Sequence, residues 1–186
     1  MNYKKNVPAK INAAFLNRDV DAAFISSIAA KKHNYVNLGI IAKKEVQSVL
    51  IIPSRSDKND KESASSNVLA KILKQHGEVL IGDKALLYSL QNNTYVDLAK
   101  LWRETYNLPF VFALLCYHKD KKVYKKIERE FLKRKQRIPR YLLQKAAKNT
   151  GVSPQNILNY LELISYKLDN KAKLGLKKFY KEAKKI

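Results

Sequence analysis

The chain has 186 residues, of which 46% are hydrophobic, so it can form one domain or two small lobes around a sizeable core. A single cysteine, Cys116, excludes an internal disulfide and a cysteine-based zinc site, and the three histidines are too far apart in sequence to suggest a metal cluster. No apolar run is long enough to cross a bilayer, and the first ten residues lack the apolar stretch of a signal peptide. These features predict a cytoplasmic protein with no metal and no membrane partner.

The formal net charge of +21 is concentrated in the last third of the chain. Residues 1–116 carry 16 Lys and Arg against 10 Asp and Glu, whereas residues 117–186 carry 21 against 6. A nucleic-acid interface would explain such a charge, but the excess is mostly lysine, and base readout and bidentate phosphate contacts favour arginine. A lysine-rich solvated surface is the favoured interpretation, and no nucleic-acid partner is expected.

The first part of the chain predicts alternating helices and short strands. Pro8 suits the first turn of a helix whose apolar face comprises Ile11, Ala14 and Phe15. Short apolar runs further along predict buried strands, and the polar stretches between them predict loops and helix starts. Strands are expected at residues 20–25, 37–42, 47–52, 78–81 and 108–116, and helices at residues 28–32, 67–75, 84–90 and 95–106.

Beyond Lys121 the pattern predicts only helices, beginning at Val123, Pro139, Ser153 and Leu174, the first of them ending at Arg134. The alternation of strands and helices in the first part predicts an α/β fold with a mainly parallel sheet. The helical C-terminal region is expected to wrap back over that sheet.

Small polar residues follow three of the predicted strands. In open α/β sheets, ligands bind beyond the carboxyl ends of strands, where helix starts offer N–H groups to an anion. Taken singly, each group is more typical of a helix cap or a strand end. Together they predict a cleft for a small carboxylate or phosphate compound. The residues concerned are Ser26 and Ser27, then Ser63, Ser65, Ser66 and Asn67, and finally Gly82 and Asp83.

Other candidates for chemistry are weaker. The sequence has no Walker loop and no GxGxxG, GxSxG or HExxH motif. Cys116 and Trp102 are predicted to lie in the core, and His118 at the surface. Glu45 and Glu62 are candidate acids or bases of the cleft, although unpaired carboxylates of this kind are usually solvated. The sequence does not identify a catalytic residue.

The run DAAFISSI at residues 21–28 resembles the D-A-x-x-x-S-S-I segment of chorismate dehydratases from the futalosine route to menaquinone. Further runs agree with that family in order and spacing: SVL at 48–50, SASS at 63–66, LIGDKAL at 80–86, DLAKLW at 97–102 and LPFVFA at 108–113. Each run alone is common, and the ordered set is specific.

The resemblance implies a two-lobed fold like that of type II periplasmic binding proteins, with a helical C-terminal region. It implies dehydration of chorismate to 3-[(1-carboxyvinyl)oxy]benzoate, with no metal or organic cofactor. Chorismate is a dicarboxylate, which suits the serine-lined helix starts. The base is either a side chain or a carboxylate of the substrate. Two alternatives stay open: a protein of the same fold that binds a small anion without chemistry, and a basic nucleic-acid-binding module.

The resemblance also implies a division of the chain. Residues 1–52 would form the first part of lobe 1, residues 53–112 lobe 2, and residues 113–186 a return strand and helices that pack mainly on lobe 1. Family members begin with a strand and a loop that carries a Tyr-x-Asn segment. This chain starts just before the helix that should come later, so that strand and loop are expected to be missing.

Overall fold

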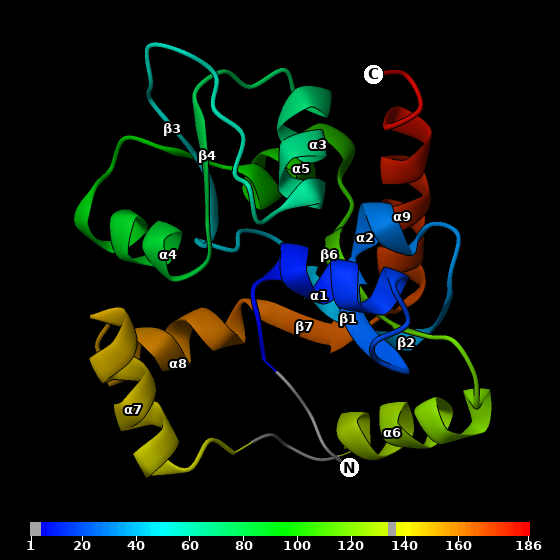
Figure 1. Ribbon diagram of the computed structural model, residues 1–186. Helices are drawn as coiled ribbons and strands as arrows, with labels where there is room; N and C mark the ends of the chain where they lie inside the picture. The colour runs from blue at the N-terminus through cyan, green and yellow to red at the C-terminus, as the bar shows by residue number, and fades with distance from the viewer. Residues whose placement is uncertain (1–4, 134–136) are drawn as a thin grey trace.

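Two antiparallel sheets organise residues 5–133 and 137–186, the part of the chain that the computed structural model describes (Figure 1). The first sheet has the strand order β1 (Ala22–Ser26), β6 (Phe110–Tyr117), β2 (Asn34–Ala42) and β7 (Ile164–Lys167). The second has the order β4 (Glu78–Ile81), β3 (Val49–Ile52) and β5 (Val96–Asp97). The predicted mixture of helices and strands is confirmed. The residues before Lys5 and the predicted helix end at Arg134 lie outside the described residues.

Nine helices are described in these ranges, and they cover the two sheets (Figure 1). They are α1 (Pro8–Leu16), α2 (Ser27–Ala30), α3 (Ala64–Ile72), α4 (Gly82–Gln91), α5 (Leu98–Tyr106), α6 (Lys121–Lys133), α7 (Arg140–Thr150), α8 (Pro154–Glu162) and α9 (Asn170–Glu182). None of them is long and apolar enough to cross a membrane.

The expected parallel sheet is wrong, because every pair of neighbouring strands in the two sheets is antiparallel. β1 and β2 point the same way, as a β-α-β unit requires, but β6 lies between them and pairs with both in antiparallel register. β3 separates β4 from β5 in the same manner. A parallel bridge, between Lys58 and Glu78, stands outside the named strands. The strand at residues 49–52, which the sequence analysis placed in lobe 1, therefore pairs within the second sheet.

The expectation of helices alone beyond Lys121 is also wrong, since β7 was missed. Ile164 continues the apolar spacing of α8, so the pattern extends the helix into this segment. In the structure this segment instead forms a strand along the outer edge of β2, where Ala42 pairs with Ile164 and Ile41 with Ser165. Tertiary pairing with a strand edge thus overrides the local helical period.

Aromatic side chains join the two sheets in one continuous core. Trp102 of α5 is fully buried, and its ring meets those of Phe110 on β6 and Phe179 on α9 at 5.3 and 6.3 Å between centroids. The prediction that Cys116 and Trp102 lie in the core is confirmed. Burial raises the pKa of the Cys116 thiol to about 12, so the thiol stays protonated and unreactive in the folded protein.

His118 is not the surface residue that was expected. Its ring stacks on Phe15 at 4.1 Å between centroids, and its Nε2 lies 2.8 Å from the Phe15 carbonyl oxygen. A ring nitrogen that faces a carbonyl oxygen must carry the proton, so Nε2 donates this hydrogen bond. His118 thereby fastens the end of α1 to the end of β6.

The last turn of α9 holds a carboxylate between two lysines, and this arrangement gives a pH prediction. Glu182 lies 2.8 Å from Lys178 Nζ and 2.7 Å from Lys185 Nζ. Hydrogen bonds from Lys178 and then Lys185 lower the pKa of Glu182 from 4.5 to about 2. Its stabilising contribution is therefore complete above pH 4.5 and is lost as the pH falls towards 2. Urea midpoints between these pH values should fall less steeply for Glu182→Gln than for the wild type. Glu62→Gln, at an exposed position, is the control for the change in charge; a slope for Glu182→Gln equal to the wild type's would contradict the assignment.

Candidate active site

Side chains at two helix starts, each after a strand of a different sheet, meet in a serine cluster, which we define as Ser27, Ser63, Ser65 and Ser66. Ser27 begins α2 directly after β1 of the first sheet, whereas the other three lie at the start of α3, which follows β3 of the second. Ser27 Oγ lies 3.0 Å from Ser65 Oγ, and the Ile28 N–H donates to Ser65 Oγ at 3.1 Å. The cluster therefore connects the helix that follows β1 of the first sheet with the helix that follows β3 of the second.

The serines at the start of α3 have different local roles. Ser63 is the N-cap of α3, since its Oγ accepts from the Ser66 N–H at 3.3 Å, and it donates to Ser66 Oγ at 2.6 Å. Ser65 does not cap its own helix, because its hydroxyl accepts from an amide of α2. Ser27, Ser65 and Ser66 are 0–2% exposed. Ser63 is therefore explained as a helix cap. The buried contact between Ser27 and Ser65 is not explained in this way, because neither side chain caps α3.

Two residues that the sequence analysis missed hold the strand end at Ser26. Asn12 of α1 accepts from the Ser26 N–H at 2.9 Å through Oδ1 and donates to Ser26 Oγ at 3.0 Å through Nδ2. Tyr180 of α9 donates to the Ser27 carbonyl oxygen at 2.8 Å. The hydroxyl and the N–H of Ser26 thus both bond to α1. Neither Asn12 nor Tyr180 stands in a motif, so no sequence signal marks them.

Replacing Asn12 with alanine should disturb ligand binding more than folding. The change removes both side-chain hydrogen bonds of the Ser26 turn, each worth about 1 kcal/mol. Because Ser26 directly precedes Ser27, we expect a higher KM for the substrate with a small fall in melting temperature. Asn159→Ala, which removes an exposed amide on α8 with a side-chain partner, is the matched control. Equal KM values for the two variants would contradict a positioning role for Asn12.

The other predicted residues have contacts of their own. Asn67 bonds both backbone groups of Asp60, donating to its carbonyl oxygen at 2.7 Å and accepting from its N–H at 3.0 Å. Asn67 therefore fastens the loop that leads into α3. Gly82 and Asp83 were expected as a turn before a helix, but they form the first turn of α4, with Gly82 at φ +67°. No hydrogen bond in the described ranges joins Gly82 or Asp83 to the serine cluster.

A second polar pair lies beside the start of α4. The Gly82 N–H donates to the Ser48 carbonyl oxygen at 2.9 Å, and Ser48 Oγ lies 3.0 Å from the Tyr160 hydroxyl of α8. Burial raises the pKa of Tyr160, so the hydroxyl keeps its proton over the physiological range. This pair connects α8 to the segment in which β3 begins.

The turn before Ser48 is held by Asp97, the N-cap of α5, which was also missed. One carboxylate oxygen accepts from the N–H groups of Val46 and Gln47 at 2.9 and 2.6 Å. The other accepts from those of Ala99 and Lys100 at 2.9 and 3.0 Å. The sequence carried a signal here, because an Asp before an apolar helical period is a typical N-cap.

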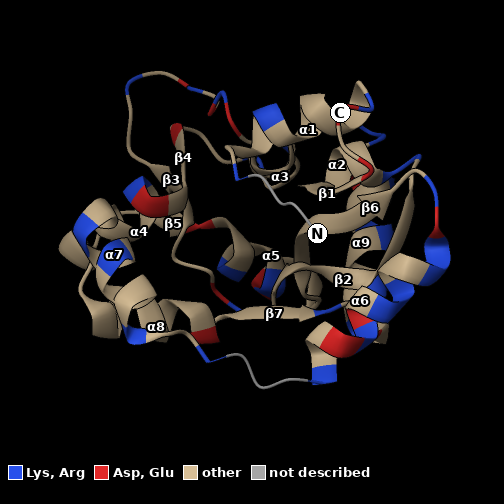
Figure 2. Ribbon diagram, turned by 60° about the horizontal axis from the view of Figure 1, so that its bottom comes forward, with Lys and Arg blue, Asp and Glu red and all other residues tan. Residues whose placement is uncertain are grey.

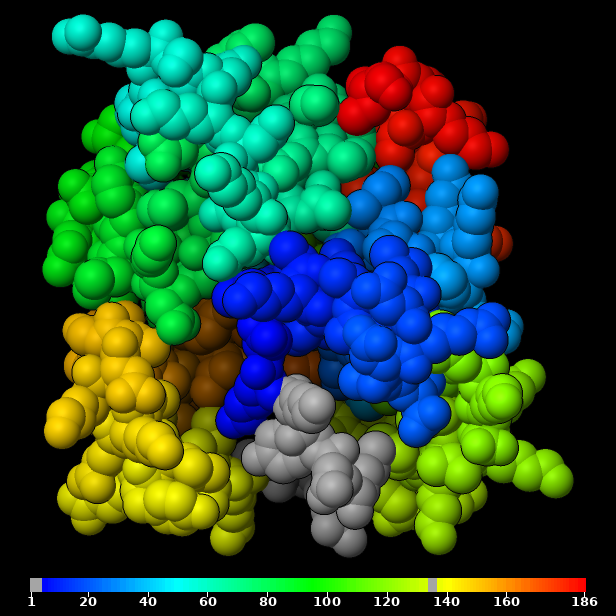
Figure 3. Space-filling view, viewed as in Figure 1, coloured from blue at the N-terminus to red at the C-terminus, as the bar shows by residue number. Residues whose placement is uncertain are grey.

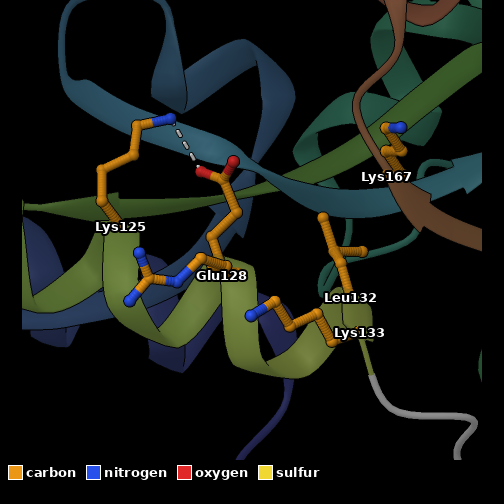
Figure 4. Close-up of a pocket in the computed structure, with 6 residues that line it drawn as sticks. Lys125, Glu128, Leu132, Lys133 and Lys167 are labelled. Atoms are coloured by element: carbon orange, nitrogen blue, oxygen red, sulfur yellow. Dashed lines mark hydrogen bonds and ion pairs between the residues drawn. The ribbon is translucent and has the colours of Figure 1, made fainter.

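No hydrogen bond among the described residues joins Glu45 or Glu62 to the serine cluster. Glu45 lies in a hollow of about 280 Å³ that is lined by cations and by one further carboxylate, and Glu62 is exposed in the loop before α3. A larger hollow of about 610 Å³ lies between α6 and β7, and Figure 4 shows Lys125, Glu128 and Lys167 among its lining residues. This hollow is open and its wall is mainly lysine and arginine, whereas the serine cluster offers buried hydroxyls. We therefore place the candidate site at the cluster.

One face of the molecular surface carries a recess. Figure 3 shows a recess bordered by dark blue atoms of the first described residues, teal atoms of the segment that begins α3, and green atoms near α4. Brown atoms of the α8–β7 segment form its floor. Ser63, Ser65 and Ser66 belong to the segment that begins α3, and Tyr160 belongs to α8, so both segments border this recess.

Comparison with a solved structure gives the class of fold. A crystal structure of a protein from Archaeoglobus fulgidus matches with a TM-score of 0.66 at 14% sequence identity, and the match covers 97% of this chain and 84% of that one. The chain is thus a mixed α/β protein that shares the fold of that structure.

Comparison of sequences gives the family. Residues 66–185 match the family model described as menaquinone biosynthesis. The chain is also 46% identical over 188 residues to a chorismate dehydratase from Campylobacter jejuni subsp. jejuni serotype O:23/36 (strain 81-176), and the alignment covers 99% of this chain and 84% of that protein. The chain belongs to the menaquinone-biosynthesis family, and the resemblance drawn from its motifs is confirmed.

Proposed function

We propose that this protein is a chorismate dehydratase that forms 3-[(1-carboxyvinyl)oxy]benzoate, and that the serine cluster binds a carboxylate of the substrate. The observation that carries the activity is the 46% identity to a chorismate dehydratase over 99% of the chain. The position of the cluster, where helices that follow the two sheets meet, supports the proposed site. It also supports a two-lobed arrangement like that of type II periplasmic binding proteins, with the substrate held between the lobes.

The reaction needs orientation more than an elaborate catalytic set. The C–O bond of the ring hydroxyl of chorismate breaks, and the C–H bond on a neighbouring ring carbon breaks with it. The electron pair of that C–H bond completes the aromatic ring. Hydroxide and the proton leave together as water. Aromatisation drives this step, so the protein must fix the substrate and place a proton acceptor near the reacting carbon. The acceptor is a side chain or a carboxylate of the substrate itself.

The serine hydroxyls suit a carboxylate because they can exchange one partner for another. Ser27 and Ser65 share a hydrogen bond with each other, and a carboxylate oxygen accepts from either hydroxyl in its place. The start of α3, a helix of nine residues, adds the positive end of its dipole. Since Ser27 and Ser65 are buried against each other, α2 and α3 must part to admit the substrate.

Replacing Ser65 and Ser66 together with alanine should weaken chorismate binding by roughly 1–3 kcal/mol, the range for charge-assisted hydrogen bonds. The free energy of unfolding should fall by a similar amount, because the buried hydroxyls also bond Ser27, the Ile28 N–H and Ser63. Titration with chorismate and urea unfolding measure the two effects. Ser153→Ala removes an N-cap hydroxyl at the start of α8 and is the control for losing a serine hydroxyl outside the cluster.

A double variant that binds chorismate normally but unfolds readily would show that these serines serve only the helix. A direct assay of chorismate turnover by the wild type separates an enzyme from a binding protein of the same fold. Binding of duplex DNA with sub-micromolar affinity at physiological salt would instead favour the nucleic-acid alternative.

A further inference from the structure

One stretch of the chain is purely cationic. Residues 131–161 contain seven Lys or Arg and no Asp or Glu. Within the described part of this stretch lie α7 and α8, and Figures 1 and 2 place these two helices side by side at one end of the molecule. No residue of α7 belongs to the serine cluster or to the Ser48–Tyr160 pair.

Only one side of α7 is packed. Leu143, Ala146 and Ala147 contact a small core of Leu86, Val152 and Ile157, and no residue of α7 is buried. On its other side, and just before the helix, three large apolar side chains lie within five residues and face solvent. They are Ile138, Tyr141 and Leu142, which are 39%, 68% and 43% exposed. Single exposed apolar residues are ordinary, but a group of them marks an interaction surface.

Unpaired cations flank this group. The four described residues concerned are Arg137, Arg140, Lys145 and Lys148, and none of them forms an ion pair within residues 5–133 and 137–186. We call these four cations, together with Ile138, Tyr141 and Leu142, the basic apolar face. A partner for this face must offer negative charge and an apolar layer together.

We propose that the basic apolar face docks on the surface of an anionic lipid bilayer. Aliphatic and tyrosine side chains among cations are typical of helices that lie at a membrane interface, where apolar groups enter the headgroup region and cations contact lipid phosphates. A nucleic acid would pair with the cations but would leave Ile138 and Leu142 in water. No membrane partner was expected because no apolar run is long enough to span a bilayer, but docking on a bilayer surface needs no such run.

The test is co-sedimentation of the intact protein with vesicles. Vesicles of phosphatidylcholine with 30% phosphatidylglycerol should bind the protein, and vesicles of phosphatidylcholine alone should bind it at least tenfold more weakly. The double variant Tyr141→Ser/Leu142→Ser, which keeps the charge, should lose at least tenfold in affinity. Arg140→Gln/Lys145→Gln should lose about 30-fold, since each cation near an anionic surface contributes about 1 kcal/mol. Circular dichroism and melting temperature check that each variant is folded.

Matched controls lie on α9. Leu174→Ser removes an apolar side chain that is 54% exposed, and Lys171→Gln/Lys177→Gln removes two exposed lysines. Both should bind anionic vesicles like the wild type. The proposal is overturned if these controls lose as much affinity as the α7 variants, or if Tyr141→Ser/Leu142→Ser binds as tightly as the wild type. Either result would mean that the vesicles attract the positive charge of the protein without regard to its position. Equal binding to both kinds of vesicle, or no binding to either, overturns it as well. Activity is not a readout here, so failure of this test leaves the proposed dehydration unaffected.

Discussion

Replacing Asp97 with alanine should lower the free energy of unfolding by roughly 3–5 kcal/mol, because four backbone N–H groups lose their acceptor. Asp97 is only 7% exposed, so water replaces the carboxylate incompletely. The loss should also loosen the turn at Val46 and Gln47, which leads directly to Ser48. We therefore expect weaker substrate binding together with the lower stability.

Urea unfolding measures the stability, and two further variants locate the cause. Asp97→Asn keeps the size of the side chain and one acceptor oxygen, so it should recover part of the loss. Asp83→Ala removes an exposed carboxylate from the first turn of α4 and should cost less than about 1 kcal/mol. A cost for Asp97→Ala no greater than that for Asp83→Ala would mean that the four hydrogen bonds contribute little.

Replacing Gly175 with alanine should destabilise the protein by about 3 kcal/mol, at the upper end of the range for overpacking. A Cβ at this position would overlap the carbonyl oxygen of Pro109, a backbone atom that cannot rotate away. To relieve the overlap, α9 must move away from the start of β6. Tyr180 moves with α9, and its hydrogen bond to the Ser27 carbonyl oxygen is lost. The variant should therefore show a raised KM as well as a lower melting temperature.

Gly151→Ala is the matched control for this substitution. Gly151 has φ +72° and open space around its Cα, so alanine there costs about 1–2 kcal/mol from the backbone alone. Tyr180→Phe tests the functional half of the argument without overpacking. If Gly175→Ala raises the KM while Tyr180→Phe does not, the displacement acts through some other contact of α9.

Local sequence patterns predicted where helices and strands lie better than they predicted which strands pair with each other. Glu78–Ile81 has the bounds expected for that strand, and a serine cap for α3 was expected within residues 63–66, where Ser63 provides it. Period and capping are properties of neighbouring residues, so a sequence displays them directly. The pairing of β6 with both β1 and β2 depends on residues about 80 positions apart, and no local signal encodes it. The parallel sheet was expected for that reason.

The candidate site shows the same division. The motif that carries Ser26 and Ser27 and the one that carries Ser63, Ser65 and Ser66 both indicated polar helix starts. Which hydroxyls meet is decided by the packing of α2 on α3, and only the structure brings Ser27 to Ser65. Asn12 and Tyr180 act on the site from helices whose sequences look ordinary. Residues that position a site through contacts with distant parts of the chain produce no recognisable spacing in the sequence.

The place of β6 between β1 and β2 also sets an order of assembly during synthesis. The second sheet lies within residues 49–97, so its strands can pair as soon as that stretch has left the ribosome. β1 and β2 emerge earlier but share no hydrogen bonds with each other, and their common partner ends at Tyr117. Until then their apolar edges have no strand to pair with, which exposes the nascent chain to aggregation. The earliest strands of this chain are thus among the later ones to be fixed, and chaperone binding to nascent chains should be strongest for chains that end before residue 117.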